Sequence, residues 1–155
     1  MSIETKLKQL NIKLPEAKAP VGAYVATKIV GNLLFISGQI SIDENTNLIK
    51  GKVGRDLTLE QGYNAAQRCG LSLLAHAKKA CDDDLSNIKA CIKLTGYVNS
   101  TEEFTDQPKV INGASDIIVK ILGRIGEHTR AAVSVSNLPL GVAVEIDGIF
   151  EVNSS

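Results

Sequence analysis

Charged side chains interrupt two runs of small apolar residues near the C-terminus, in EHTRAAVSVSNLPLGVAVEIDGIFEV (residues 127–152). Arg130 opens the first apolar run, and Glu145 and Asp147 lie inside the second. A buried charge is costly unless it is paired or bound to a ligand. A guanidinium group can hold a carboxylate through two parallel hydrogen bonds, and a nearby acid can hold a water molecule. These residues therefore predict an anion pocket, with an ordinary solvent-facing ion pair as the second interpretation.

The positions of these charges depend on how the two runs pair. Asn-Leu-Pro-Leu at 137–140 is typical of a turn, which predicts a C-terminal hairpin. In the expected register, Arg130 faces Asp147 and Ala132 faces Glu145. We therefore expect the arginine and both acids on one face of the sheet, where small residues between them leave room for a ligand.

The composition favours one soluble globular domain spanning residues 1–155, with 44% apolar and 22% charged residues. Acids and bases balance at 17 each and no basic stripe stands out, which disfavours nucleic acid as a partner. No apolar run approaches the ~18 residues that a membrane span needs. The charged N-terminus lacks the apolar stretch of a secretory signal, so we expect a cytoplasmic protein without membrane contact.

Side chains that could bind a metal are few and scattered. Three cysteines, Cys69, Cys81 and Cys91, lack metal-type spacing, and we expect reduced, packed thiols. His76 is expected at a helix surface or edge and His128 in a loop, so they form no metal-binding pair. The sequence therefore predicts no metal site and no cofactor.

Alternating and β-branched residues at 23–30 and 33–40 predict an N-terminal hairpin, and residues 48–49 could add a short third strand. From residue 59 to about residue 79, apolar and small residues recur with helical spacing. Thr58 at the start of this segment, with Gln61 three positions later, predicts a capping box.

The second half of the chain predicts a strand, a helix and the C-terminal hairpin. Residues 88–98 alternate in part, and Thr105 or Asp106 is expected to cap an amphipathic helix that ends near Gly123. Two such helices packed on one face of a mixed sheet make an α+β architecture. The other face of the sheet then needs a cover, which self-association would supply most simply.

Motifs at both ends of the chain resemble a known family. VGAYVAT (21–27) with VGNLLFISGQI (30–40), and TRAAVSVSNLPLGVAVEIDGI (129–149), are together similar to the YjgF/RidA family of enamine/imine deaminases. The intervening GKVGRDLTLEQGYNAAQRCGLSLLA (51–75) and LTGYVNS (94–100) indicate a divergent branch. The resemblance implies a chorismate-mutase-like α+β subunit that assembles as a homotrimer with sites between subunits.

The resemblance also implies roles for individual residues. Arg130 would hold the carboxylate of a substrate, and Glu145 would position or activate the hydrolytic water. Four further residues would line the cleft, namely Tyr24, Ser37, Gly38 and Asn112. Many members carry a cysteine two positions after the arginine, where this chain has Ala132. A thiol therefore has no role at that position, although the backbone of residue 132 could still contact the substrate.

The implied reaction is hydrolysis of 2-imino or enamine acids to 2-oxo acids and ammonia. An imine carbon is already electrophilic, so an arginine, a carboxylate and an oriented water are sufficient, without a metal or cofactor. The alternative is a non-catalytic binder or sensor of small carboxylates such as 2-oxo acids, because it also needs Arg130. A third interpretation is an endoribonuclease or translation inhibitor, which zero net charge and the absence of paired histidines disfavour.

Overall fold

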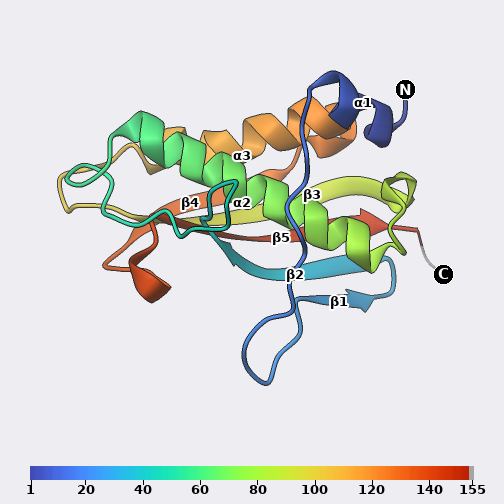
Figure 1. Ribbon diagram of the computed structural model, residues 1–155, viewed down its shortest axis with the longest axis horizontal. Coiled ribbons are helices and arrows are strands. Elements are labelled where there is room, and N and C mark those ends of the chain that lie inside the picture. Colours follow the sequence, from blue (N-terminus) through green and yellow to red (C-terminus); the bar gives the residue numbers. More distant parts are fainter. Residues whose placement is uncertain (154–155) are drawn as a thin grey trace.

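The computed structural model describes residues 1–153, which form a five-stranded mixed sheet with helices on one side (Figure 1). The strand order is β1-β2-β5-β3-β4, so β4 lies at an edge. The strands are β1 (Thr27–Val30), β2 (Leu33–Ile40), β3 (Ile88–Asn99), β4 (Thr129–Val135) and β5 (Val144–Val152). Neighbouring strands are antiparallel, except that β3 and β4 are parallel.

Two long helices, α2 (Leu59–Ala80) and α3 (Gln107–Leu122), pack against each other on one face of the sheet (Figure 1). This arrangement confirms the predicted α+β architecture. Gly113 of α3 permits a close approach of the two helices, because a side chain there would collide with the carbonyl oxygen of Tyr63 in α2. Within residues 1–153, the opposite face of the sheet has no helical cover.

The helix starts follow local sequence signals. The Thr58 hydroxyl accepts from the Gln61 N–H at 3.1 Å, and the Gln61 side chain accepts from the Thr58 N–H at 2.8 Å, which confirms the capping box. Helix α3 begins after Asp106, with Pro108 in its first turn, where a backbone N–H has no helical partner to lose. The predicted apolar face of α3 is buried: Val110, Ile111, Ala114, Ile117, Ile118, Ile121 and Leu122.

The predicted C-terminal hairpin is wrong. Strands β4 and β5 do not pair with each other, because β3 lies between them and pairs with both. The connection from β3 through α3 to β4 is a strand–helix–strand crossover, so β4 runs parallel to β3. The chain then passes through the short 3₁₀ turn η3 (Pro139–Gly141) and reaches the other side of β3 as β5.

This pairing also overturns the predicted facing of the charges. Leu94 of β3 lies beside Arg130 of β4 and Gly148 of β5, so these three positions share the helix-covered face. Glu145 and Asp147 lie an odd number of residues from Gly148 in β5, so they point to the open face. Arg130 and the two acids are therefore on opposite faces of the sheet.

The N-terminal segment contains a helix that the sequence analysis did not predict. Helix α1 (Ile3–Gln9) is capped by the Ser2 side chain and buries Leu7 against the core. From α1 the chain runs across α2 toward β1 (Figure 1). His76 of α2 lines a hollow beside this segment and is only 6% exposed, so its predicted place at a helix surface or edge is wrong.

Smaller expectations have mixed outcomes. Strand β1 begins at Thr27 instead of residue 23, and residues 48–49 contribute an isolated bridge from Leu48 instead of a third strand. His128 lies in the loop before β4, and the three cysteines are free and buried, as predicted. No helix within residues 1–153 has the length and apolarity needed to cross a membrane.

Candidate functional site

Arg130 projects from the edge strand β4 toward α3, where neutral oxygen atoms hold it half-buried. Its Nη1 donates to Asn112 Oδ1 at 2.8 Å and to Ser115 Oγ at 3.1 Å. Its Nη2 donates to the Pro108 carbonyl oxygen at 3.4 Å. Asn112 and Ser115 are three residues apart in α3, so they lie on one side of that helix. The structure thus brings together two residues of the predicted site, Arg130 and Asn112.

Ser115 and His128 extend this cluster, and the sequence analysis missed their role in it. Ser115 Oγ lies 2.9 Å from His128 Nε2, and His128 Nδ1 lies 2.6 Å from the Gly126 carbonyl oxygen. A carbonyl oxygen only accepts, so Nδ1 carries the proton and, in the neutral ring, Nε2 accepts from the serine hydroxyl. The serine oxygen is then free to accept from Arg130. The sequence contained one signal for this role of His128. It precedes Arg130 by two positions, and residues two apart lie on the same side of a strand.

Arg130 has no acidic partner in the described chain. The ion pairs within residues 1–153 join other residues, and none of its hydrogen bonds uses Nε. The ion pair with Asp147 considered from the sequence is therefore wrong, because that acid lies on the other face. A guanidinium group oriented by neutral acceptors keeps its charge available to an anion, and its Nε–Nη2 edge can take a carboxylate in two parallel hydrogen bonds.

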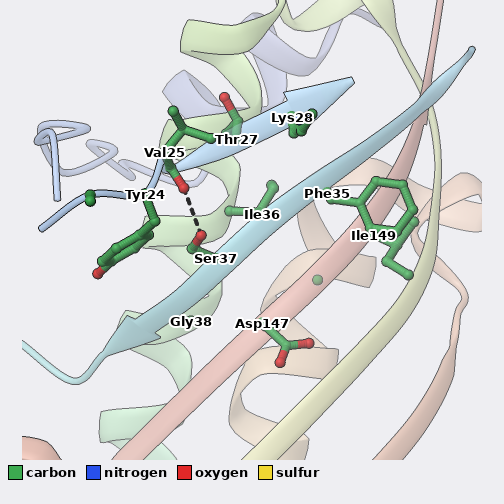
Figure 2. Close-up of a pocket in the computed structure, with 12 residues that line it drawn as sticks. Tyr24, Val25, Thr27, Lys28, Phe35, Ile36, Ser37, Gly38, Asp147 and Ile149 are labelled. Atoms are coloured by element: carbon green, nitrogen blue, oxygen red, sulfur yellow. Dashed lines mark hydrogen bonds between the residues drawn. The ribbon is translucent and has the colours of Figure 1, made fainter. Parts of the chain in front are cut away.

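Three other predicted residues gather on the far side of the sheet. Tyr24, Ser37 and Gly38 line a hollow of about 660 Å³, together with Asp147 (Figure 2). Ser37 Oγ donates to the Val25 carbonyl oxygen at 2.8 Å, which fixes the segment that carries Tyr24 against β2 (Figure 2). The volume lies within the range of ~300–1,000 Å³ typical of small-molecule sites.

Two carboxyl groups adjoin this hollow from β5. Burial raises the pKa of Glu145, and the nearby charge of Asp147 raises it further. Burial also raises the pKa of Asp147, an effect that Tyr97 and Lys93 partly offset. Gly38 lies against Glu145, since a Cβ atom at that position would collide with the carboxylate. A carboxyl group with a raised pKa is a stronger proton acceptor, which suits it to activate a water molecule.

The predicted site residues thus form two groups separated by the sheet. Arg130, Asn112 and Ala132 belong to β4 and α3, whereas Tyr24, Ser37, Gly38 and Glu145 lie toward the open face. Ala132 is half-buried on the helix side, two residues beyond Arg130. Five hollows in the described part of one chain are lined by neither Arg130 nor Glu145.

Comparisons with known proteins place this geometry in a family. The chain matches the family described as "YjgF/chorismate mutase-like, putative endoribonuclease" over residues 4–148. Protein TCP17 of Trypanosoma cruzi is 39% identical over 153 residues, covering 98% of this chain and 95% of that protein. A RutC family protein of Pyrococcus horikoshii is 31% identical over 137 residues, covering 86% and 90%. The chain belongs to the YjgF/RidA family, as its motifs predicted.

Solved structures share the fold. A protein of unknown function from Agrobacterium tumefaciens is 44% identical, with a TM-score of 0.90 and coverage of 97% of this chain and 92% of that one. A "putative endoribonuclease" of Shewanella oneidensis is 32% identical, with a TM-score of 0.93 and coverage of 98% and 100%. RidA from an Antarctic Psychrobacter is 28% identical, with a TM-score of 0.59 and coverage of 88% and 94%. The backbone follows the first two more closely than the third, which fits a divergent branch.

Proposed function

We propose that this protein hydrolyses 2-imino acids and their enamine tautomers to 2-oxo acids and ammonia. Water adds to the imine carbon, which forms a C–O bond and leaves the nitrogen on a single bond. The nitrogen gains protons and departs as ammonia, while the C–O bond becomes a carbonyl. One imino acid and one water give one 2-oxo acid and one ammonia, so the site has to orient the imine and prepare the water.

The observation that supports this proposal most strongly is the oriented, acid-free guanidinium of Arg130. Asn112 and Ser115 fix its Nη1, and none of the ion pairs in residues 1–153 occupies it. A 2-imino acid carries its carboxylate directly next to the carbon that reacts. A bidentate hold on that carboxylate would therefore also fix the reacting carbon.

Glu145 would act on the water. Its pKa is raised by burial and by Asp147, so its carboxylate would accept a proton from the attacking water more readily than an exposed glutamate. Tyr24, Ser37 and Gly38 would line the space around the imine, because they border the hollow next to Glu145.

A homotrimer would bring the two groups together. Arg130 lies on an edge strand, so a second chain can approach it without displacing another strand. The open face of the sheet exposes Leu33 and Phe35, of which Phe35 lines the same hollow as Asp147, and such apolar surface favours association. We propose that Arg130 of one subunit meets Glu145 of the partner subunit across this contact.

An imine generated in the assay mixture tests the activity directly. An amino-acid oxidase releases the 2-imino acid, and ammonia release is then followed with and without the protein. We expect the protein to accelerate ammonia release, while peroxide formation by the oxidase stays constant, and Arg130→Ala to remove the acceleration. Ammonia release at the spontaneous rate with intact protein would contradict the proposed activity.

A carboxylate binder is the second candidate, because the Arg130 cluster is complete within one chain whereas Glu145 lies beyond the sheet. A binder would keep its affinity for 2-oxo acids and leave imine hydrolysis at the spontaneous rate. The described site gives less support to an endoribonuclease. His128 is held in the Arg130 cluster and His76 lines a separate hollow beside α2, so the two do not form an acid–base pair.

A further inference from the structure

A second hollow lies between the N-terminal segment and the C-terminal half of α2. Its volume is about 430 Å³, within the range of ~300–1,000 Å³ of small-molecule sites. Its polar wall comprises Lys18, Lys79, His76 and Thr27. It shares Tyr24, Val25 and Thr27 with the hollow of the candidate site, but no residue of the Arg130 cluster borders it.

His76 is the central polar group of this second hollow. It is 6% exposed, yet its ring joins no hydrogen bond within residues 1–153. In the same residues, every side-chain nitrogen or oxygen that is fully sealed from solvent has a partner. The ring nitrogens of His76 must therefore reach the solvent in the hollow. Ring nitrogens that reach solvent and have no protein partner are available to bond to a ligand in the hollow.

The charge of the hollow is positive. Lys18 and Lys79 border it, and none of its lining residues is acidic. Lys79 Nζ donates to the Ala17 carbonyl oxygen at 3.2 Å, which steadies the ammonium group beside the opening and leaves it further donors. Burial and Lys79 lower the pKa of His76, so at neutral pH its ring is uncharged and offers one N–H donor.

Apart from Tyr24, the rest of the wall is apolar and consists of small side chains: Ala19, Pro20, Val25, Ala26 and Ala80. Inorganic phosphate would leave this surface uncovered, whereas an organic anion would cover it. Lysine acts as a point charge without the fixed fork of arginine, so it holds an anionic head without demanding one geometry.

We propose that this hollow binds a small organic carboxylate, with its anionic head between Lys18, Lys79 and His76 and its apolar body against the alanine and proline wall. The site is independent of the Arg130 cluster and of the proposed imine hydrolysis. Tyr24 lines both hollows, so an occupant would contact a residue of the candidate site as well.

Proton NMR of the two histidine rings offers a direct test, because the chain has only two histidines. His76→Gln assigns the signals, and benzoate and inorganic phosphate are then titrated at pH 7. We expect a saturable shift of the His76 signal with benzoate, and a higher His76 pKa when benzoate is bound, since an anion stabilises the protonated ring. No saturable shift, or equal affinity for phosphate and benzoate, would overturn the proposal.

Two neighbouring lysines provide a matched pair of variants. Lys79→Ala should weaken benzoate binding about tenfold to a hundredfold, the typical effect of losing one charged hydrogen bond. Lys78→Ala removes the same charge from a side chain that pairs with Glu4 at 3.4 Å and borders a different hollow, so affinity should hold. Equal losses in both variants would overturn the site in favour of general charge attraction.

Arg130→Ala separates this inference from the proposed function. The His76 response to benzoate should persist in that variant, even when all response at the Arg130 cluster is lost. A response that disappears with Arg130→Ala would show that benzoate binds only at the candidate active site, and the second site would then be rejected.

Discussion

Arg130 and Glu145 are both charged residues in apolar strands, yet the fold surrounds them differently. Arg130 is held by Asn112, Ser115 and a backbone carbonyl of its own chain, with a histidine behind the serine. Glu145 makes no ion pair within residues 1–153, and burial beside a second acid raises its pKa. The arginine is positioned by the folded chain, whereas the acid lies in surroundings that disfavour its charge.

This difference indicates which half of the site depends on assembly. Neutral acceptors orient a guanidinium without cancelling its charge, so the Arg130 cluster can bind an anion in a single chain. The acids on the open face lie among exposed apolar side chains such as Phe35, which a partner subunit would cover. Anion binding should therefore survive changes that break assembly, whereas hydrolysis should not.

Disruption of the open face should have the largest effect. Phe35→Asp places a charge in the proposed contact, and we expect dissociation to a 16.5 kDa monomer that has lost imine hydrolysis. Ile29→Asp is the control, because Ile29 is 48% exposed compared with 41% for Phe35 and pairs with the buried Leu34, so it lies on the helix side of the edge strand β1, away from β4. Light scattering measures the mass of each variant, and ammonia release measures its imine hydrolysis. A native protein that is monomeric at micromolar concentration would contradict the proposed trimer.

Substitutions of Arg130 should have the second-largest effect, which is on ligand binding. Arg130→Ala should abolish binding of a 2-oxo acid at the Arg130 cluster while circular dichroism shows unchanged helix content. Arg130→Lys keeps the charge but loses the planar fork, so binding should weaken by about 1–3 kcal/mol in calorimetry. If Arg130→Ala unfolds the protein, the arginine has a structural role instead.

Glu145→Gln should separate hydrolysis from binding. The amide keeps the shape of the side chain but cannot accept the proton of water as a carboxylate does. Imine hydrolysis should fall by about 10²-fold or more, whereas 2-oxo acid affinity should hold or rise because a negative charge is removed. Hydrolysis at the native rate would assign the activation of water to another group.

Ser115→Ala should have a smaller effect on the other half of the site. It removes one of the two side-chain acceptors that orient Arg130 Nη1, while Asn112 remains. Affinity for a 2-oxo acid should fall only about threefold to tenfold, because Asn112 still orients the same guanidinium nitrogen. Ser86→Ala, at an exposed serine in the 3₁₀ turn η1 (Leu85–Asn87), serves as the control. An unchanged affinity in Ser115→Ala would show that Asn112 alone orients the arginine.

The smallest expected effect concerns how the free energy of unfolding depends on pH. The folded chain raises the pKa of Asp147 above its ordinary value of 3.8, so between these two pKa values the folded state binds more protons than the unfolded state. The free energy of unfolding therefore falls as pH rises through this window and levels off above it. Asp147→Asn should remove this fall and be slightly more stable than the native protein at pH 7. Thermal unfolding of the variant and of the native protein at pH 3 and pH 7 measures this difference in stability. A stabilisation of equal size at the two pH values would contradict the ionisation argument.

Local signals predicted much of the fold. The capping box at Thr58 and the apolar face of α3 depend on residues close together in the chain, and the structure confirms both. Helix α1 was missed because a seven-residue helix has little pattern of its own, and it is held by Leu7 packing against distant residues. His76 was misplaced for a similar reason, since its burial depends on a segment more than fifty residues away.

The sequence by itself determined the residue types that can do chemistry here and the family to which the chain belongs. An arginine and two acids in apolar strands, with the SGQ motif at residues 37–39, are recognisable without coordinates. Only the tertiary structure decided which of these residues meet. Strand pairing is set by the crossover through α3, which inserts β3 between β4 and β5 and turns Arg130 away from Glu145. Alternation along each strand was read correctly, but the relation between two strands depends on the strand that lies between them.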